Sequence, residues 1–236
     1  MFRGCLLICV FYCAISSIHY AIAAQINFGI ISCCYIISVP INTFAGLFWF
    51  DEKLNMKVCL GIVVTLCGIV WISISNGSNL QFDSLVDEET RGQNQFLSIV
   101  FALCVGLGNS SQTIISKFMM RNAKFHVMSM TADFGLIFFL IAFSVSLFNL
   151  VSGSPSLNFQ NFILALFVGS LGMTCWLVGQ NACINGVVGP AVSIMYTACI
   201  FTTILQVTFL GIVPSINQIC AGFVAFCGIL IIIFGK

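Results

Sequence analysis

The sequence predicts an all-α membrane protein with eight transmembrane helices. Of its 236 residues, 60% are hydrophobic and only 6% are charged, whereas about a quarter of the residues of an average soluble domain carry a charge. The charged residues gather in short connecting stretches. This leaves apolar runs of about 18 to 25 residues, long enough to cross ~30 Å of hydrocarbon as helices. The composition therefore excludes a soluble fold.

Eight such runs follow one another along the chain. They lack the alternation of polar and apolar positions typical of a transmembrane strand, and lipid tolerates only helices or closed barrels. The first run also has features of a secretory signal peptide, but its length favours a spanning helix. We therefore expect helices at Gly4–Ala24, Phe28–Phe50, Val58–Ser75, Phe96–Ser116, Val127–Val151, Phe162–Gln180, Gly186–Leu210 and Ile216–Phe234.

The basic residues are divided unevenly between the two sides of the membrane. If the N-terminus is cytoplasmic, seven of the eight Lys and Arg residues fall on the cytoplasmic side, and only Arg91, in the acidic loop Asn76–Gln95, does not. Because basic residues concentrate in cytoplasmic loops, we expect both termini in the cytoplasm, in a membrane whose identity stays open. The seven residues are Arg3, Lys53, Lys57, Lys117, Arg121, Lys124 and Lys236.

The sequence gives no sign of enzyme, metal or cofactor chemistry. All 13 cysteines lie in or at the edge of apolar runs, where a thiol behaves as a small hydrophobe, and their spacing does not match a metal site. The chain lacks the Gly-x-Ser-x-Gly and HExxH motifs of hydrolases. We therefore expect no catalytic residue, metal or cofactor, and the net charge of +1 gives no reason to expect a nucleic-acid partner.

The acidic loop Asn76–Gln95 divides the eight runs into three before it and five after it. Transporters are commonly built from inverted repeats, and an offset of 161 residues places Tyr35 on Tyr196 and Gly61 on Gly222. The order of polar helix ends, turns and Gly-containing helices also matches. We interpret residues 1–75 as a truncated first repeat of three helices, 76–95 as an acidic extracytoplasmic loop and 96–236 as a second repeat of five.

Two groups of residues resemble the repeat ends of EamA-type carriers of the drug/metabolite transporter superfamily. The first is Phe50-Asp51-Glu52-Lys53-Leu54 with Gly61, Gly68 and Trp71; the second is Gly189-Pro190-Ala191 with Gly222 and Gly228. The resemblance implies ten helices in two inverted five-helix repeats, both termini in the cytoplasm, and a cytoplasmic acidic turn at Asp51 and Glu52.

The chain departs from this family pattern in two places. Ile212-Val213-Pro214 stands where a family member often repeats a Gly-Glu pair, and the first two helices of the pattern have no counterpart. We therefore expect the remnant of a 5+5 bundle. A fragment, a shortened paralogue and a mispredicted gene start remain open as its origin.

Polar residues inside the apolar runs are the candidates for a solute path. Pro40 removes one backbone hydrogen bond from the second run, so we expect a kink there, and the fourth run carries a polar belt after two glycines. Packing and helix–helix hydrogen bonding are the alternative interpretation of each. The substrate-binding candidates are Tyr35, Ser38, Asn42, Asn109, Gln112, Gln180 and Tyr196.

Two ionisable residues are candidates for proton or ion coupling. Asp133 is the one acidic residue embedded in a run, and a charge at a helix centre costs ~2.5 to 3.5 kcal/mol on insertion scales. The alternative is that its carboxylate reaches Lys117, Arg121 or His126 near the interface. His19 is the second candidate, and its alternative is a structural hydrogen-bond donor.

These observations predict a multi-pass transporter of small organic metabolites that works by alternating access. The rival hypothesis is a non-transporting structural or accessory membrane protein, or an inactive fragment of a carrier, because two family helices lack counterparts. The expected partners are a small-molecule solute and the lipid bilayer, and the sequence leaves a homodimer open.

Overall fold

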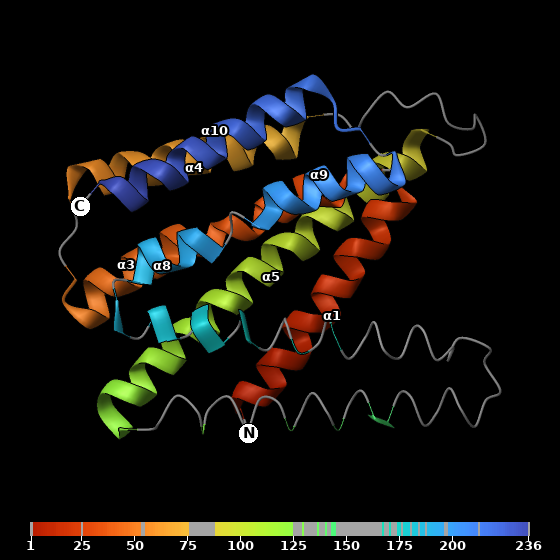
Figure 1. Ribbon diagram of the computed structural model, residues 1–236. Helices are drawn as coiled ribbons and strands as arrows, with labels where there is room; N and C mark the ends of the chain where they lie inside the picture. The colour runs from red at the N-terminus through yellow and green to blue at the C-terminus, as the bar shows by residue number, and fades with distance from the viewer. Residues whose placement is uncertain are drawn as a thin grey trace. The chain divides into compact units, whose positions relative to one another are not determined.

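The computed structural model describes residues 2–24, 26–52, 55–75, 88–124, 188–195, 198–211 and 213–235, and scattered positions between 129 and 186. Every element in these ranges is helical. In chain order they are α1 (Phe2–Ala23), α2 (Phe28–Ser32), the 3₁₀ segment η1 (Cys33–Ile37), α3 (Ser38–Phe50), α4 (Met56–Ile74), α5 (Glu88–Ala123), α8 (Val188–Met195), α9 (Ala198–Leu210) and α10 (Ile216–Phe234) (Figure 1).

Five stretches among these residues are long and apolar enough to cross a membrane. A shorter apolar helix, Ala198–Phe209, accompanies them. The all-helical class and the multi-pass membrane character predicted from the sequence are thus confirmed, whereas most of the predicted fifth and sixth runs lies outside the described residues. The five stretches are Gly4–Ala23, Phe28–Phe50, Met56–Ile74, Thr90–Ala123 and Ile216–Phe234.

Local side chains set several helix ends. Asn27 caps α2 by accepting from the Gly29 N–H at 2.9 Å, and Asn55 caps α4 in the same way. At α10 the Ser215 hydroxyl and the Gln218 side chain form a capping box. Such acceptors satisfy the first N–H groups of a helix, which have no partner within it. The chain leaves α3 through Asp51, whose φ of 56° is left-handed.

α5 begins earlier than the apolar pattern predicts. Its first residue is Glu88, so the last eight residues of the predicted loop 76–95 are helical. Two long-range bonds hold this end: Arg91 Nε donates to the Ala24 carbonyl at 3.2 Å, and Gln95 Nε2 donates to the Ser75 carbonyl at 2.8 Å. The start of α5 therefore lies beside the ends of α1 and α4.

The chain forms two compact units, and the division falls within α5. One unit is 1–114 with 186–236, and the other is 115–185. The first contains most of the described residues and brings α1–α4, from before the acidic loop, together with α8–α10, from after it. The following description concerns this first unit.

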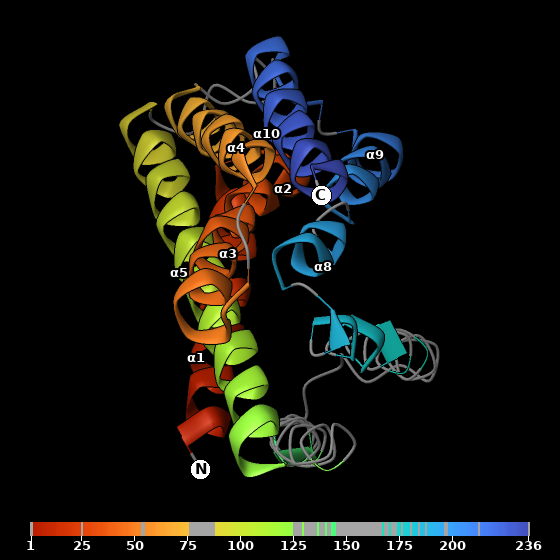
Figure 2. The same ribbon diagram turned by 90° about the vertical axis from the view of Figure 1, so that its left-hand side faces the viewer.

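α4 and α10 lie side by side and antiparallel (Figures 1 and 2). Small residues line their contact: a Cβ on Gly68 would come within 2.5 Å of the Ala225 nitrogen, and a Cβ on Gly61 within 2.8 Å of the Gly228 carbonyl oxygen. In lipid, small residues let helix backbones approach closely enough for van der Waals packing to hold them. This α4–α10 seam therefore depends on glycine at positions 61 and 68, where a larger residue would not fit.

The consecutive segments α2, η1 and α3, called the broken helix below, contact α8 and α9 in a crossed pattern. α2 contacts α9, and α3 contacts α8. The two segments consequently run in opposite directions, as the ribbon shows (Figure 1). Beyond these contacts the outer surface is apolar: Phe48 is 74% exposed and Phe223 66%, as expected where lipid is the solvent.

Candidate functional site

The middle of the Phe28–Phe50 run departs from regular α-helix. Residues Cys33–Ile37 are 3₁₀, and Pro40 follows in the first turn of α3, buried. Proline has no N–H to donate to the carbonyl one turn earlier, and a 3₁₀ stretch inside a helix often marks a hinge. The substrate-binding candidates Tyr35, Ser38 and Asn42 surround this irregular stretch.

Ser38 and Asn42 are polar, completely enclosed and unsatisfied. Their relative exposures are 0% and 1%. The Ser38 hydroxyl and both polar atoms of the Asn42 side chain have no hydrogen-bond partner within the described part of the chain. By contrast the neighbouring Thr43 donates to the Val39 carbonyl at 2.8 Å, so burial alone does not leave a side chain unpaired on this helix.

α5 faces this stretch through its polar belt. The Ser110 hydroxyl lies 3.3 Å from the Ser38 carbonyl oxygen and 3.0 Å from the Gly106 carbonyl oxygen. Gly106 permits the approach, because a Cβ there would come within 2.9 Å of the Tyr35 carbonyl oxygen. Two residues after Ser110, Gln112 is buried with 0% exposure. The contact between Ser110 and Ser38 brings the polar residues of η1–α3 and those of α5 to one interface.

The structure thus brings five sequence candidates onto two facing segments. Tyr35, Ser38 and Asn42 lie on η1–α3, while Asn109 and Gln112 lie on α5. The Tyr35 ring also contacts the Phe28 ring edge-on, with centroids 6.1 Å apart. Three other candidates, Gln180, Tyr196 and Asp133, lie outside the described residues.

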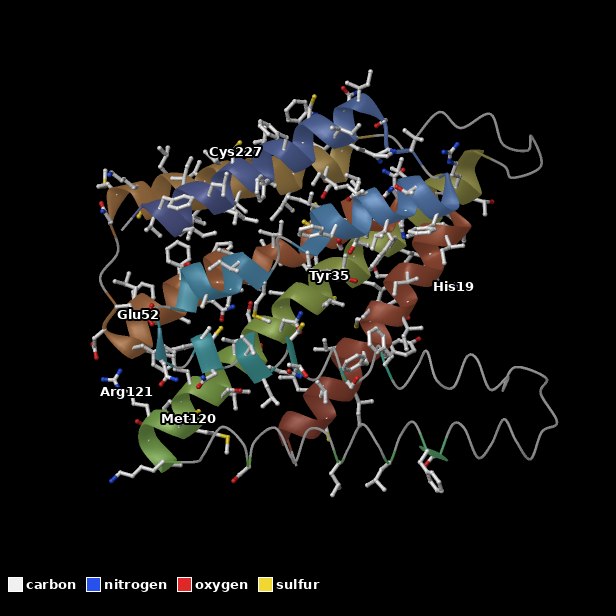
Figure 3. All side chains as sticks on the ribbon, viewed as in Figure 1. His19, Tyr35, Glu52, Met120, Arg121 and Cys227 are labelled. Atoms are coloured by element: carbon white, nitrogen blue, oxygen red, sulfur yellow. The ribbon has the colours of Figure 1, made fainter. Side chains whose placement is uncertain are left out.

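His19 is not part of this interface. It lies exposed on α1, where its ring packs edge-on against Tyr20 with centroids 5.5 Å apart. Tyr20 in turn stacks on Phe101 of α5. Figure 3 shows His19 well separated from Tyr35. A coupling role for His19 would therefore have to act away from the Ser38–Asn42 group.

The acidic turn is a compact helix end. The Glu52 N–H donates to the Gly46 carbonyl at 3.0 Å, and the Glu52 side chain folds over Gly46, where a Cβ would come within 2.5 Å of Oε2. Asp51 is exposed and Glu52 partly so. Figure 3 labels Glu52 at this end of the bundle. Here Gly46 provides the space that the returning chain occupies.

Sequence reasoning missed a second polar contact, between α2 and α9. Gln206 Oε1 accepts from the Phe28 N–H at 2.5 Å and from the Gly29 N–H at 3.4 Å. The Asn27 side chain reaches the Thr203 carbonyl at 3.5 Å. The available signal was the amide of Gln206 within an otherwise apolar run, since such groups are costly in lipid without a partner.

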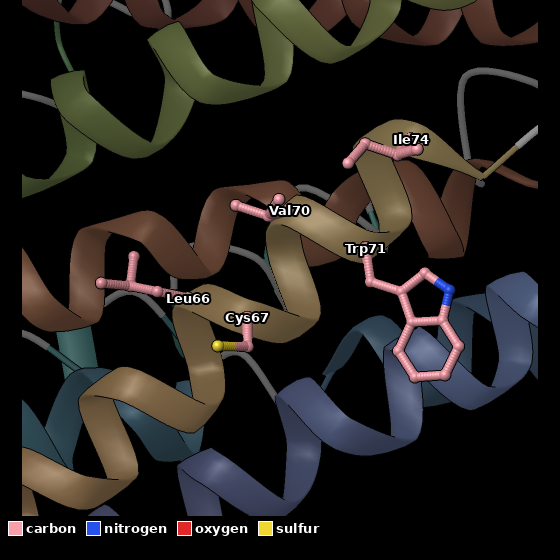
Figure 4. A pocket seen from close by; sticks show the side chains of 5 residues that line it. All are labelled: Leu66, Cys67, Val70, Trp71 and Ile74. Atoms are coloured by element: carbon pink, nitrogen blue, oxygen red, sulfur yellow. The ribbon is translucent and has the colours of Figure 1, made fainter.

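A hollow on α4 is not a candidate site. Its lining comes from one face of a single helix: Leu66, Cys67, Val70, Trp71 and Ile74 (Figure 4). A solute site needs convergent polar groups to fix orientation, and these side chains offer little beyond the Trp71 N–H. The hollow is part of the apolar outer surface.

Among the described residues, no group of three or more His, Cys, Asp or Glu side chains could hold a metal ion. No protein-family model matches this chain, and no curated protein matches it. The resemblance to EamA-type carriers therefore rests on the residues quoted for it, and the function must be argued from the geometry.

Proposed function

We propose that this chain is a multi-pass carrier of small organic solutes that works by alternating access. The observation that carries the proposal is the buried, unsatisfied pair Ser38 and Asn42. Burying an amide or hydroxyl without a hydrogen bond costs roughly 2–7 kcal/mol. A helix that only packs would gain stability from apolar residues at both positions. A carrier needs such groups, because a solute or water passing between α3 and α5 supplies their partners.

The crossed helix contacts support an inverted-repeat plan. The offset of 161 moves Phe28–Ser32 of α2 onto 189–193 within α8. It likewise moves α3 onto 199–211, one residue beyond α9, and α4 onto 217–235, one residue beyond α10. Two copies related by a two-fold axis must contact reciprocally. The contacts α2 with α9, α3 with α8 and α4 with α10 satisfy this requirement.

The ends of these helices fit the proposed topology with cytoplasmic termini. Asn55 Nδ2 donates to the Gly235 carbonyl at 2.9 Å, so the start of α4, where Lys57 lies, is beside the end of α10. Arg91, the exception to the charge bias, bonds Ala24 at the far end of α1. The separation of Lys57 from Arg91 agrees with the positive-inside tendency.

A labelling experiment separates a carrier from a structural membrane protein. Asn42→Cys should react with a membrane-impermeant thiosulfonate in proteoliposomes, because a solute path admits water to this position. Thr43→Cys is the matched control, since its side chain bonds its own helix and needs no water. Mass spectrometry assigns the label among the native cysteines.

Equal and negligible labelling at both positions would contradict the proposed carrier function. It would favour the accessory-protein hypothesis, in which α3 and α5 form a dry contact. Counter-flow of labelled polar metabolites, such as polyols, amides and amino acids, then identifies the solute class in vesicles that pass the labelling test.

A further inference from the structure

The contact between α2 and α9 combines very close packing with a polar bond across the two segments. Gly29 lies against the backbone of Thr203, where a Cβ would collide with the Thr203 nitrogen and hydroxyl. Gln206 accepts from the N–H groups at the start of α2. One turn further along each segment, the buried thiols of Cys33 and Cys199 lie near each other.

Gln206 satisfies backbone groups that α2 cannot satisfy alone. The first N–H groups of a helix have no intrahelical partner. Asn27 provides one acceptor, to Gly29, and Gln206 provides the acceptor for Phe28 from a helix 178 positions away. Moving α9 away would leave the Phe28 N–H and the Gln206 amide unpaired until water replaces the bond. Separation is therefore tied to the entry of water.

The position of this contact suits a gate. α2 begins four residues after Ala24, which Arg91 holds at one end of the bundle, whereas Ser38 and Asn42 lie further along the broken helix, in α3. The reciprocal contact, with α8, is made by α3, the helix that carries both of these residues. The α2–α9 contact thus lies between the Arg91 end of the bundle and the unsatisfied polar group.

We propose that the α2–α9 contact is a gate at the Arg91 end of the solute path and that the Gln206 side chain is its latch. This inference rests on the proposed carrier function. The hydrogen bond that Gln206 accepts from the Phe28 N–H stabilises the closed state, and the 3₁₀ segment that begins at Cys33 allows α2 to move relative to α3. Opening exposes Cys33 and Cys199 to water.

Thiol labelling measures the latch without requiring transport. In Gln206→Met, a change that keeps the length of the side chain but removes the acceptor, we expect a membrane-impermeant maleimide to label Cys33 or Cys199 about 2- to 10-fold faster, the range that one net hydrogen bond implies. Thr202→Val is the matched control on α9, since the Thr202 hydroxyl bonds the Ala198 carbonyl of its own helix. Its labelling rate should equal that of the unaltered chain.

Oxidation tests the gate in the unaltered protein. Copper phenanthroline with molecular oxygen should join Cys33 and Cys199: each thiol loses a proton and one electron to the oxidant, and a disulfide forms. The bond locks α2 against α9, so uptake should stop and return when a reductant is added. Cys33→Ser should transport equally with and without oxidant.

Two results would overturn the gate: labelling unchanged by Gln206→Met, or full uptake by a chain whose Cys33–Cys199 disulfide is confirmed by mass spectrometry. If uptake proceeds normally in either case, the gate is rejected but the carrier function is retained. Faster labelling of Gln206→Met supports the latch even if no solute crosses, and the failure then belongs to the carrier function alone.

Discussion

Ser17 on α1 and Ser98 on α5 hydrogen-bond each other twice. The Ser17 hydroxyl donates to the Ser98 carbonyl at 3.0 Å, and the Ser98 hydroxyl donates to the Ser17 carbonyl at 2.9 Å. Both residues are fully buried. In lipid this pairing satisfies both hydroxyls at a point where only small side chains fit between the helices, so it fixes the register of α1 on α5.

Removing either hydroxyl should weaken this contact. Ser17→Ala and Ser98→Ala should each lower the free energy of unfolding by about 0.5–1.5 kcal/mol, the net value of one hydrogen bond. Unfolding in mixed micelles measures the effect. Ser111→Ala is the control, because its hydroxyl bonds the Leu107 carbonyl of its own helix. If Ser17→Ala and Ser98→Ala lower the free energy of unfolding no more than Ser111→Ala does, the pair has no tertiary role.

The α4–α10 seam should not tolerate a larger side chain at Gly68. Gly68→Leu would place atoms where the Ala225 backbone lies, and overpacking of this kind costs about 1–3 kcal/mol. Thermal unfolding in detergent should show a lower midpoint. Gly92→Ala on α5 is the control, since a Cβ there meets nothing within 4 Å, and it should leave the midpoint unchanged or raise it. A tolerated leucine would show that the seam is looser than the structure indicates.

The left-handed backbone at Asp51 should favour glycine and reject β-branched residues. Left-handed conformations cost roughly 1–2 kcal/mol for ordinary L-residues, and Asp51 has a φ of 56°. We expect Asp51→Val to destabilise the fold by about that amount, and Asp51→Gly to be neutral or stabilising. Equal stability of the two variants, measured by chemical denaturation, would be inconsistent with this turn.

Asn42→Leu should separate stability from function. Leucine removes the unsatisfied buried amide, so the midpoint of thermal unfolding should rise or stay level, while solute counter-flow in proteoliposomes should fall by about 10-fold, the upper end of what one lost hydrogen bond to the solute implies. Thr43→Val, next to it and nearly isosteric, should keep its uptake. Retained transport by Asn42→Leu would remove Asn42 from the solute path.

The role of Asp133 in proton coupling stays a prediction from the sequence. If its carboxyl carries the coupling proton, Asp133→Asn should abolish uptake driven by a pH gradient and leave expression intact. Uptake assayed with and without an imposed gradient provides the comparison. Gradient-driven uptake at the unaltered rate would end the coupling role.

Local patterns in the sequence determined the class of this protein and several helix bounds. The predicted run Ile216–Phe234 coincides with α10, and Val58–Ser75 differs from α4 by two residues at its start and one at its end. Apolar content and caps such as Asn55 and Ser215 are properties of adjacent residues, so they can be recognised without the fold. The first turns of α5 were missed because their residues are polar, and the bonds from Arg91 and Gln95 that hold them come from distant parts of the chain.

Only the tertiary structure decided which helix faces meet and which polar groups are left without partners. Asn42 and Thr43 are neighbouring polar residues in one run, yet one is unsatisfied and the other bonded. The role of Gln206 depends on its contact with Phe28, 178 positions away. In lipid all apolar faces are nearly equivalent, so close approach at small residues and hydrogen bonds between helices select the contacts. That selection depends on three-dimensional proximity, which hydropathy along the chain does not contain.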